Sequence, residues 1–122
     1  MLPKANRLRR NQDFSKIYKR GNRYLGKDLV LRALRRQEKP EVWNAILPTR
    51  VGISIGKKVS KHAVERNRLK RLIRAAMGEL LPKVKPGWDL AIVVKPTATK
   101  CNYRQILQQL KELLAREVWD GH

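Results

Sequence analysis

Cationic side chains are concentrated between residues 57 and 74, where eight Lys or Arg face a single acid, Glu65. Like charges four residues apart on a helix repel, so an anion that neutralises them stabilises such a run. Guanidinium groups match phosphate oxygens in pairs, and an amide between two arginines can read a base edge or a ribose hydroxyl. We therefore expect phosphate contacts, rather than an ordinary solvated helix face, from Lys57, Lys58, Lys61, Arg66, Asn67, Arg68, Lys70, Arg71 and Arg74.

Two aromatic residues form the second group of interest. Phe14 and Tyr18 lie four positions apart with Ile17 between them, which places all three on one side of a short helix. We expect Ile17 to be core. Phe14 and Tyr18 suit a core position and a stacking platform for single-stranded nucleic acid equally well. A later strand alternates Val51, Ile53 and Ile55 with Gly52, Ser54 and Gly56, so that one of its faces is nearly bare and another backbone can approach it.

The residue types that enzymes use for hydrolysis are poorly grouped. The ten acids are scattered, and the sequence spacing pairs none of them as a metal site or an acid–base dyad. No serine has a convincing histidine partner, and one cysteine with two histidines excludes a multi-cysteine or histidine-rich metal site. The sequence therefore disfavours catalysis by the protein itself, and we expect it to bind no cofactor.

Composition narrows the class further. The 122 residues carry 29 Lys plus Arg against 10 Asp plus Glu, a net charge of +19, and 42% are hydrophobic. That is one domain with a modest core and a polyanionic partner, rather than a disordered basic tail. No apolar run approaches the roughly 20 residues of a membrane span, and the basic start lacks a signal peptide's apolar stretch. With one cysteine, we expect a reducing, cytoplasmic location and no membrane partner.

These side chains need elements to position them. Asn11 as N-cap and Gly21 after two basic residues predict a helix over residues 12–20. Alternation predicts strands within 24–36 (strongest over 28–34) and over 50–57, with a hairpin loop over 37–49. An apolar stripe predicts a helix over 60–80. An unbroken apolar run predicts a central strand over 89–95. A capping box formed by Asn102 and Gln105 predicts the start of a last helix. We interpret residues 1–10 as a mobile basic arm and 118–122 as a frayed tail.

The resulting order is helix, two strands, helix, strand, helix, which defines a single α+β domain with a small sheet covered by helices. The second strand, the long helix and the third strand form a βαβ crossover if those strands are parallel.

Three blocks of the sequence closely resemble the bacterial ribonuclease P protein component. The most specific is RVGISIGKKVSKHAVERNRLKRLIR, and the others are LRRNQDFSKIYKRG and WDLAIVVKP, in the family's order and spacing. The resemblance implies a two-layer α/β sandwich with a small mixed sheet and an unusual left-handed βαβ crossover, where right-handed is the strong default. It also implies a ribonucleoprotein endonuclease subunit that helps to remove the 5′ leader of precursor tRNA.

The resemblance further implies a division of labour. The RNA subunit would catalyse hydrolysis with its own Mg²⁺ ions, and the Arg66-Asn67-Arg68 helix face, with Lys57, Lys58 and Lys61, would contact that RNA. A cleft between the first helix and the sheet would hold the single-stranded leader. We place Phe14, Tyr18, Arg32, Arg50 and Ser54 in it. Arg32 stands where relatives often carry an aromatic residue, so leader contact there would be ionic rather than stacked.

Electrostatics agrees with this interpretation, because a +19 protein between two RNAs lowers their repulsion. Substrate affinity should therefore rise and the magnesium requirement fall. A ribosomal or nucleoid binding module remains the alternative, since composition alone does not separate the two. A DNA-binding helix-turn-helix protein is disfavoured by three strands and the lack of a recognition-helix pair, so no DNA partner is expected. An independent protein nuclease lacks clustered carboxylates.

Overall fold

The computed structural model describes residues 2–36 and 47–120. The elements in chain order are η1 (Lys4–Asn6), α1 (Asn11–Arg20), β1 (Asn22–Leu25), β2 (Leu29–Arg35), β3 (Arg50–Ser54), α2 (Ala63–Leu80), η2 (Leu81–Lys83), β4 (Trp88–Val94), η3 (Pro96–Lys100) and α3 (Tyr103–Leu114), where η denotes a short 3₁₀ helix.

The four strands form one mixed sheet in the order β1-β2-β4-β3. β1 with β2 and β2 with β4 are antiparallel, whereas β3 runs parallel to β4. The predicted central strand and the βαβ crossover through α2 are both confirmed. The left hand of that crossover stays a prediction from the resemblance.

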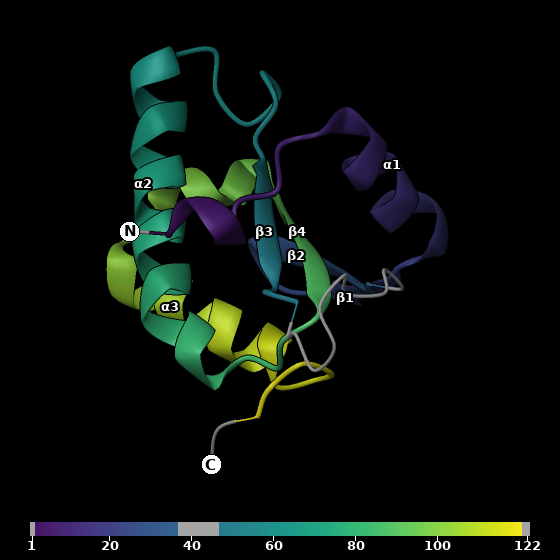
Figure 1. Cartoon of the computed structure of the whole chain (residues 1–122). Coiled ribbons are helices and arrows are strands. Elements are labelled where there is room, and N and C mark those ends of the chain that lie inside the picture. Colours follow the sequence, from purple (N-terminus) through teal and green to yellow (C-terminus); the bar gives the residue numbers. More distant parts are fainter. Residues whose placement is uncertain (1, 37–46, 121–122) are drawn as a thin grey trace.

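Helices cover both faces of the sheet (Figure 1). The inner face packs against α2 and α3 and presents Leu29, Leu31, Ala33, Val51, Leu90, Ile92 and Val94, all buried. The outer face packs against α1 through a small cluster of Leu8, Ile17 and Ala91. The two-layer sandwich therefore consists of the sheet with α2 and α3, and α1 adds a partial layer on the outer face.

Local sequence explains most element boundaries. The Asn102 side chain accepts from the Gln105 backbone N–H and the Gln105 side chain accepts from that of Asn102, so the predicted capping box is confirmed. α2 begins at Ala63 rather than residue 60, because Ser60 folds back to donate to Glu65 and to accept from the backbone of His62. β3 ends at Ser54 rather than 57, ahead of a turn in which Val59 N–H bonds to Gly56 C=O.

The predicted single strand over 24–36 is instead two strands. β1 and β2 form a hairpin, closed where Gly26 N–H donates to Leu29 C=O. A Cβ on Gly26 would lie 2.7 Å from that carbonyl oxygen, so the turn needs a glycine. β1 is mostly exposed and therefore lacks the apolar alternation that reveals a strand. The predicted loop over 37–49 lies outside the described residues except for its last three positions.

The mobile arm over residues 1–10 and the frayed tail over residues 118–122 stay predictions, but the described parts of both chain ends pack against the domain. Leu2 and Leu8 are buried, Leu8 N–H bonds to Val51 C=O and the Asn6 amide bonds to Thr49 C=O, so residues 2–10 line the β3 edge. We call them the N-terminal segment. Val118 is fully buried and Trp119 bridges to Val84, which fixes the tail as far as residue 120. Isolated leucines and valines between charged residues carry no periodicity, so no sequence pattern predicts this packing.

Candidate nucleic-acid interface

The outer face of the sheet is the polar one. Alternation along the three paired strands turns Arg32, Arg50, Gly52, Ser54 and Asp89 toward α1, while their neighbours enter the core. α1 lies over this face on the buried Ile17 side chain. At 100° per residue, Phe14 and Tyr18 then lie on one flank of the helix and Asp13, Lys16 and Arg20 on the other. We call these the aromatic flank and the cationic flank.

Phe14 fills the bare part of β3. A Cβ on Gly52 would lie 2.3 Å from Phe14 Cζ and 3.1 Å from Leu8 Cδ2, so only a glycine at this position admits the ring. Phe14 is half-buried, and it therefore serves as a packing residue while keeping part of its ring accessible. The two interpretations of Phe14, core and platform, are compatible with this placement.

Tyr18 is more open, with 40% of its surface exposed. The Arg32 guanidinium lies over its ring, 4.8 Å from the ring centre, and Nη1 donates to the Tyr18 carbonyl at 3.3 Å. Arg32 on β2 thus covers one face of the Tyr18 ring. Ser54 lies at the β3 end of the same outer face and is half-buried.

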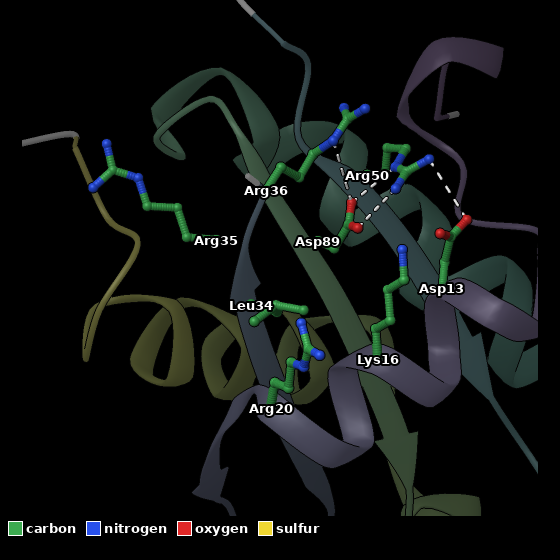
Figure 2. A pocket seen from close by; sticks show the side chains of 8 residues that line it. All are labelled: Asp13, Lys16, Arg20, Leu34, Arg35, Arg36, Arg50 and Asp89. Carbon is green, nitrogen blue, oxygen red and sulfur yellow. Dashed lines mark hydrogen bonds and ion pairs between the residues drawn. The ribbon is translucent and has the colours of Figure 1, made fainter. Parts of the chain in front are cut away.

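Arg50 belongs to a different part of the outer face. Its Nε and Nη2 donate to both Asp89 oxygens, at 2.8 and 2.7 Å, and its Nη1 lies 3.6 Å from Asp13 Oδ2 (Figure 2). Asp89 is buried, and Arg36 also approaches it at 3.9 Å. Arg50 therefore links α1 to the sheet on the cationic flank. The predicted contact of Arg50 with the leader stays a prediction. Asp13 and Asp89 already engage the Arg50 guanidinium, so it has fewer donors left for a phosphate.

The predicted phosphate-binding cluster divides in the structure into open and anchored residues. Lys57, Lys58, Lys61, Asn67, Arg71 and Arg74 are exposed, on α2 and on the turn before it. Arg66 donates to the Ser60 carbonyl at 2.7 Å and Arg68 to the Thr99 carbonyl at 2.8 Å. These two half-buried arginines hold the turn and η3 against α2, so they position the surface even where they do not touch a ligand.

The N-terminal segment, which was predicted to be a mobile arm, adds further cations to this surface. A cavity of about 250 Å³ between this segment, β3 and α2 is lined by Arg7 and Arg9 on one side and Lys70 and Arg74 on the other. Phe14 and Gly52 also line it, so it joins the aromatic flank to the α2 cluster. The docking of Leu8 on β3 creates this arrangement.

One buried acid serves the fold rather than the interface. Asp28 accepts hydrogen bonds from Gln109 Nε2 at 2.6 Å and from the Cys101 thiol at 3.2 Å, tying β2 to α3. Burial opposes its charge, but hydrogen bonds from Thr97, Cys101 and Gln109, with Lys27 nearby, hold the pKa of Asp28 below its usual value. Burial and the neighbouring Asp28 raise the pKa of the Cys101 thiol, so this cysteine is not activated as a nucleophile.

The described residues contain neither a cluster of metal-ligating side chains nor a helix suited to span a membrane. Residues 2–36 and 47–120 contain no group of three His, Cys, Asp or Glu side chains placed to hold a metal ion. In the same part of the chain, no helix has the length and apolar character needed to cross a bilayer.

Comparisons of sequence and of structure both match this chain to ribonuclease P proteins. The family model for ribonuclease P matches residues 2–118. A ribonuclease P protein component from Cyanothece is 47% identical, with all of both chains covered, and one from Microcystis aeruginosa is 47% identical over 99% of this chain and 98% of its own. The solved structure of a mutant RNase P protein from Staphylococcus aureus superimposes with a TM-score of 0.81 at 29% identity, covering 95% of this chain and 92% of that one. The RNase P protein from Thermotoga maritima shares the fold, with a TM-score of 0.76 over 91% of this chain and 96% of that one, at 23% identity.

Proposed function

Since the chain belongs to the ribonuclease P protein family, we propose that it acts as the RNA-binding subunit of a ribonucleoprotein that removes the 5′ leader of precursor tRNA. In this proposal the exposed cations of α2 and its preceding turn bind the RNA subunit. The outer face around Phe14, Tyr18 and Arg32 holds the leader. The subunit works in the cytoplasm, where precursor tRNA is made, with no need for DNA or a membrane.

One observation carries the leader assignment: a half-buried Phe14 and a 40% exposed Tyr18 share one helix flank with a guanidinium over the second ring. A planar cation and two partly open rings suit unpaired bases and their phosphates, because every base has a face that can stack. A base-paired duplex offers no such faces.

The proposal assigns hydrolysis to the RNA subunit and its Mg²⁺ ions. Support comes from the side chains of the interface, which are cations, amides and aromatics, with Asp13 and Asp89 directed at Arg50. The protein would neutralise phosphate repulsion between catalyst and substrate, so its effect should be largest at low magnesium and should weaken as salt rises.

The test is cleavage of precursor tRNA at low magnesium and moderate salt, with protein alone, a bacterial ribonuclease P RNA alone, and the two together. Cleavage at the mature 5′ end only in the mixture supports the proposal. A protein that cuts alone would place the catalyst in the chain, and a protein that neither cuts nor stimulates would make it a binding module for another RNA.

A matched pair of variants separates specific contact from general charge. Arg71→Ala removes an exposed cation from α2, whereas Lys111→Ala removes one from α3, outside the proposed interface. We expect Arg71→Ala to weaken binding of the RNA subunit and Lys111→Ala to leave it unchanged. Arg68→Ala should also weaken binding, but its bonds to η3 make the fold a second cause, so its melting temperature must be measured alongside.

A further inference from the structure

The cationic flank of α1 borders a cavity of its own. It has a volume of about 230 Å³ and is lined by Asp13, Lys16, Arg20, Leu34, Arg35, Arg36, Arg50 and Asp89 (Figure 2). Phe14, Tyr18, Arg32 and Ser54 do not line it. Of the five residues predicted for the leader cleft, only Arg50 lines it, so the cavity adjoins that cleft on the other flank of α1.

The acids in this cavity are engaged by the protein itself. Asp89 is held by both donors of Arg50 and approached by Arg36, and Asp13 lies 3.6 Å from Arg50. Among the described residues, neither of these carboxylates is ion-paired with Lys16, Arg20 or Arg35. Two cations of α1, Lys16 and Arg20, thus border the cavity with no ion-paired acid among the described residues, while the Arg35 side chain points away from α1 (Figure 2).

The arrangement costs stability without a ligand. Lys16 and Arg20 are four residues apart on α1, where like charges repel. In Figure 2, Lys16 extends toward the Arg50–Asp89 pair and Arg20 lies beside Leu34, so the cations border a floor that is partly apolar.

We propose that this cavity is a second phosphate-binding site for single-stranded RNA, which takes the part of the leader upstream of the aromatic flank. This inference rests on the proposed function. An α-helix with its side chains is about 10–12 Å across, so a strand held on one flank can pass around α1 to the other. A duplex is too wide to enter a cavity of about 230 Å³, which favours the unpaired leader over the helices of the RNA subunit.

The experiment uses the holoenzyme and precursor tRNAs whose leaders are shortened one nucleotide at a time. Lys16→Ala/Arg20→Ala removes two lining cations. Lys19→Ala/Arg23→Ala is the matched control, because it removes the same charge from exposed positions that do not line the cavity. With wild-type protein and the control, affinity should fall about tenfold when the leader becomes too short to reach the cavity.

For Lys16→Ala/Arg20→Ala that fall should be absent, because long leaders then bind as weakly as short ones. The slope of the salt dependence with a long leader should decrease by about 0.7 for each phosphate that the variant no longer neutralises. A step that persists in this variant, or equal losses in the control, would overturn the proposal. Titration of the protein with inorganic pyrophosphate supplies another arm: specific binding without any leader-length step would assign the cavity to free phosphates and also overturn it.

Failure of this inference is distinguishable from failure of the proposed function. If precursor tRNA still binds more tightly than mature tRNA but Lys16→Ala/Arg20→Ala has no length-specific effect, only the second site is wrong. If no leader of any length adds affinity, the leader cleft and the second site are both wrong.

Discussion

The two faces of the sheet differ in what their side chains do. The inner face is a layer of aliphatic side chains against α2 and α3, and the seven of them named above are at most 5% exposed. The outer face carries Arg32, Arg50, Ser54 and Asp89 under a single helix. A strand can serve both roles because its side chains alternate, so one face stabilises the domain while the other remains available for RNA.

Charge follows the same division. Residues 2–20, which cover the outer face and the β3 edge, contain seven Lys or Arg and one acid. Residues 103–120, which form α3 and the tail, contain three Lys or Arg and three acids. The net charge of +19 is thus distributed unevenly between the outer and inner sides of the sheet. Substitutions on the inner side should therefore change stability, and those on the outer side should change RNA binding.

The largest expected effect is on the inner face. Leu90 is fully buried in β4 between two strands and the helices, so Leu90→Ala should lower the free energy of unfolding by about 2–5 kcal/mol. Urea denaturation followed by circular dichroism measures this change. Leader affinity, measured where the variant is still folded, should be unchanged, and a selective loss of leader binding would contradict the division between faces.

A smaller effect is expected at Phe14, where packing and binding overlap. Phe14→Ala removes a stacking ring, which should weaken precursor tRNA binding by about 1–3 kcal/mol and leave mature tRNA unaffected. Phe14→Leu keeps an apolar group over Gly52 and so serves as the control for packing. Equal losses for precursor and mature tRNA would remove Phe14 from the leader cleft.

Arg32 should contribute less. Its guanidinium lies over Tyr18 at the surface, where such an interaction is worth about 0.5–1 kcal/mol. Arg32→Gln should reduce leader affinity a few-fold and flatten its salt dependence, while Arg32→Lys retains the charge. Filter binding at several salt concentrations measures both, and an Arg32→Lys variant as weak as Arg32→Gln would show that the planar group matters more than the charge.

The smallest expected effect is a loss of stability at low pH. It arises at Asp28, which ties β2 to α3 on the inner side of the sheet. Because the pKa of Asp28 is lowered in the folded protein, the unfolded chain binds a proton first as pH falls below about 4. Stability should therefore be lost as pH decreases from that value through the folded-state pKa. Asp28→Asn should make thermal stability less dependent on pH in this range, and an unchanged dependence would contradict the assignment.

Regular patterns in the sequence predicted the elements that pack through them. The α2 stripe, the apolar β4 run and the Asn102–Gln105 cap all have a spacing that reveals their structure. No such pattern marks β1, the docking of Leu8 on β3, or the Arg50–Asp89 pair, because these depend on contacts between distant parts of the chain. The pair joins residues 39 positions apart that become neighbours only through the parallel β3–β4 register.

The most direct test of the central claim is photo-crosslinking from a leader that carries a short-range photoreactive nucleotide, within the assembled ribonucleoprotein. We predict adducts on the outer side of the sheet, at Phe14, Tyr18 and Arg32, and none on α3. Adducts on α3 that match or exceed those on α1 would contradict the division of the molecule into a stabilising face and an RNA-binding face.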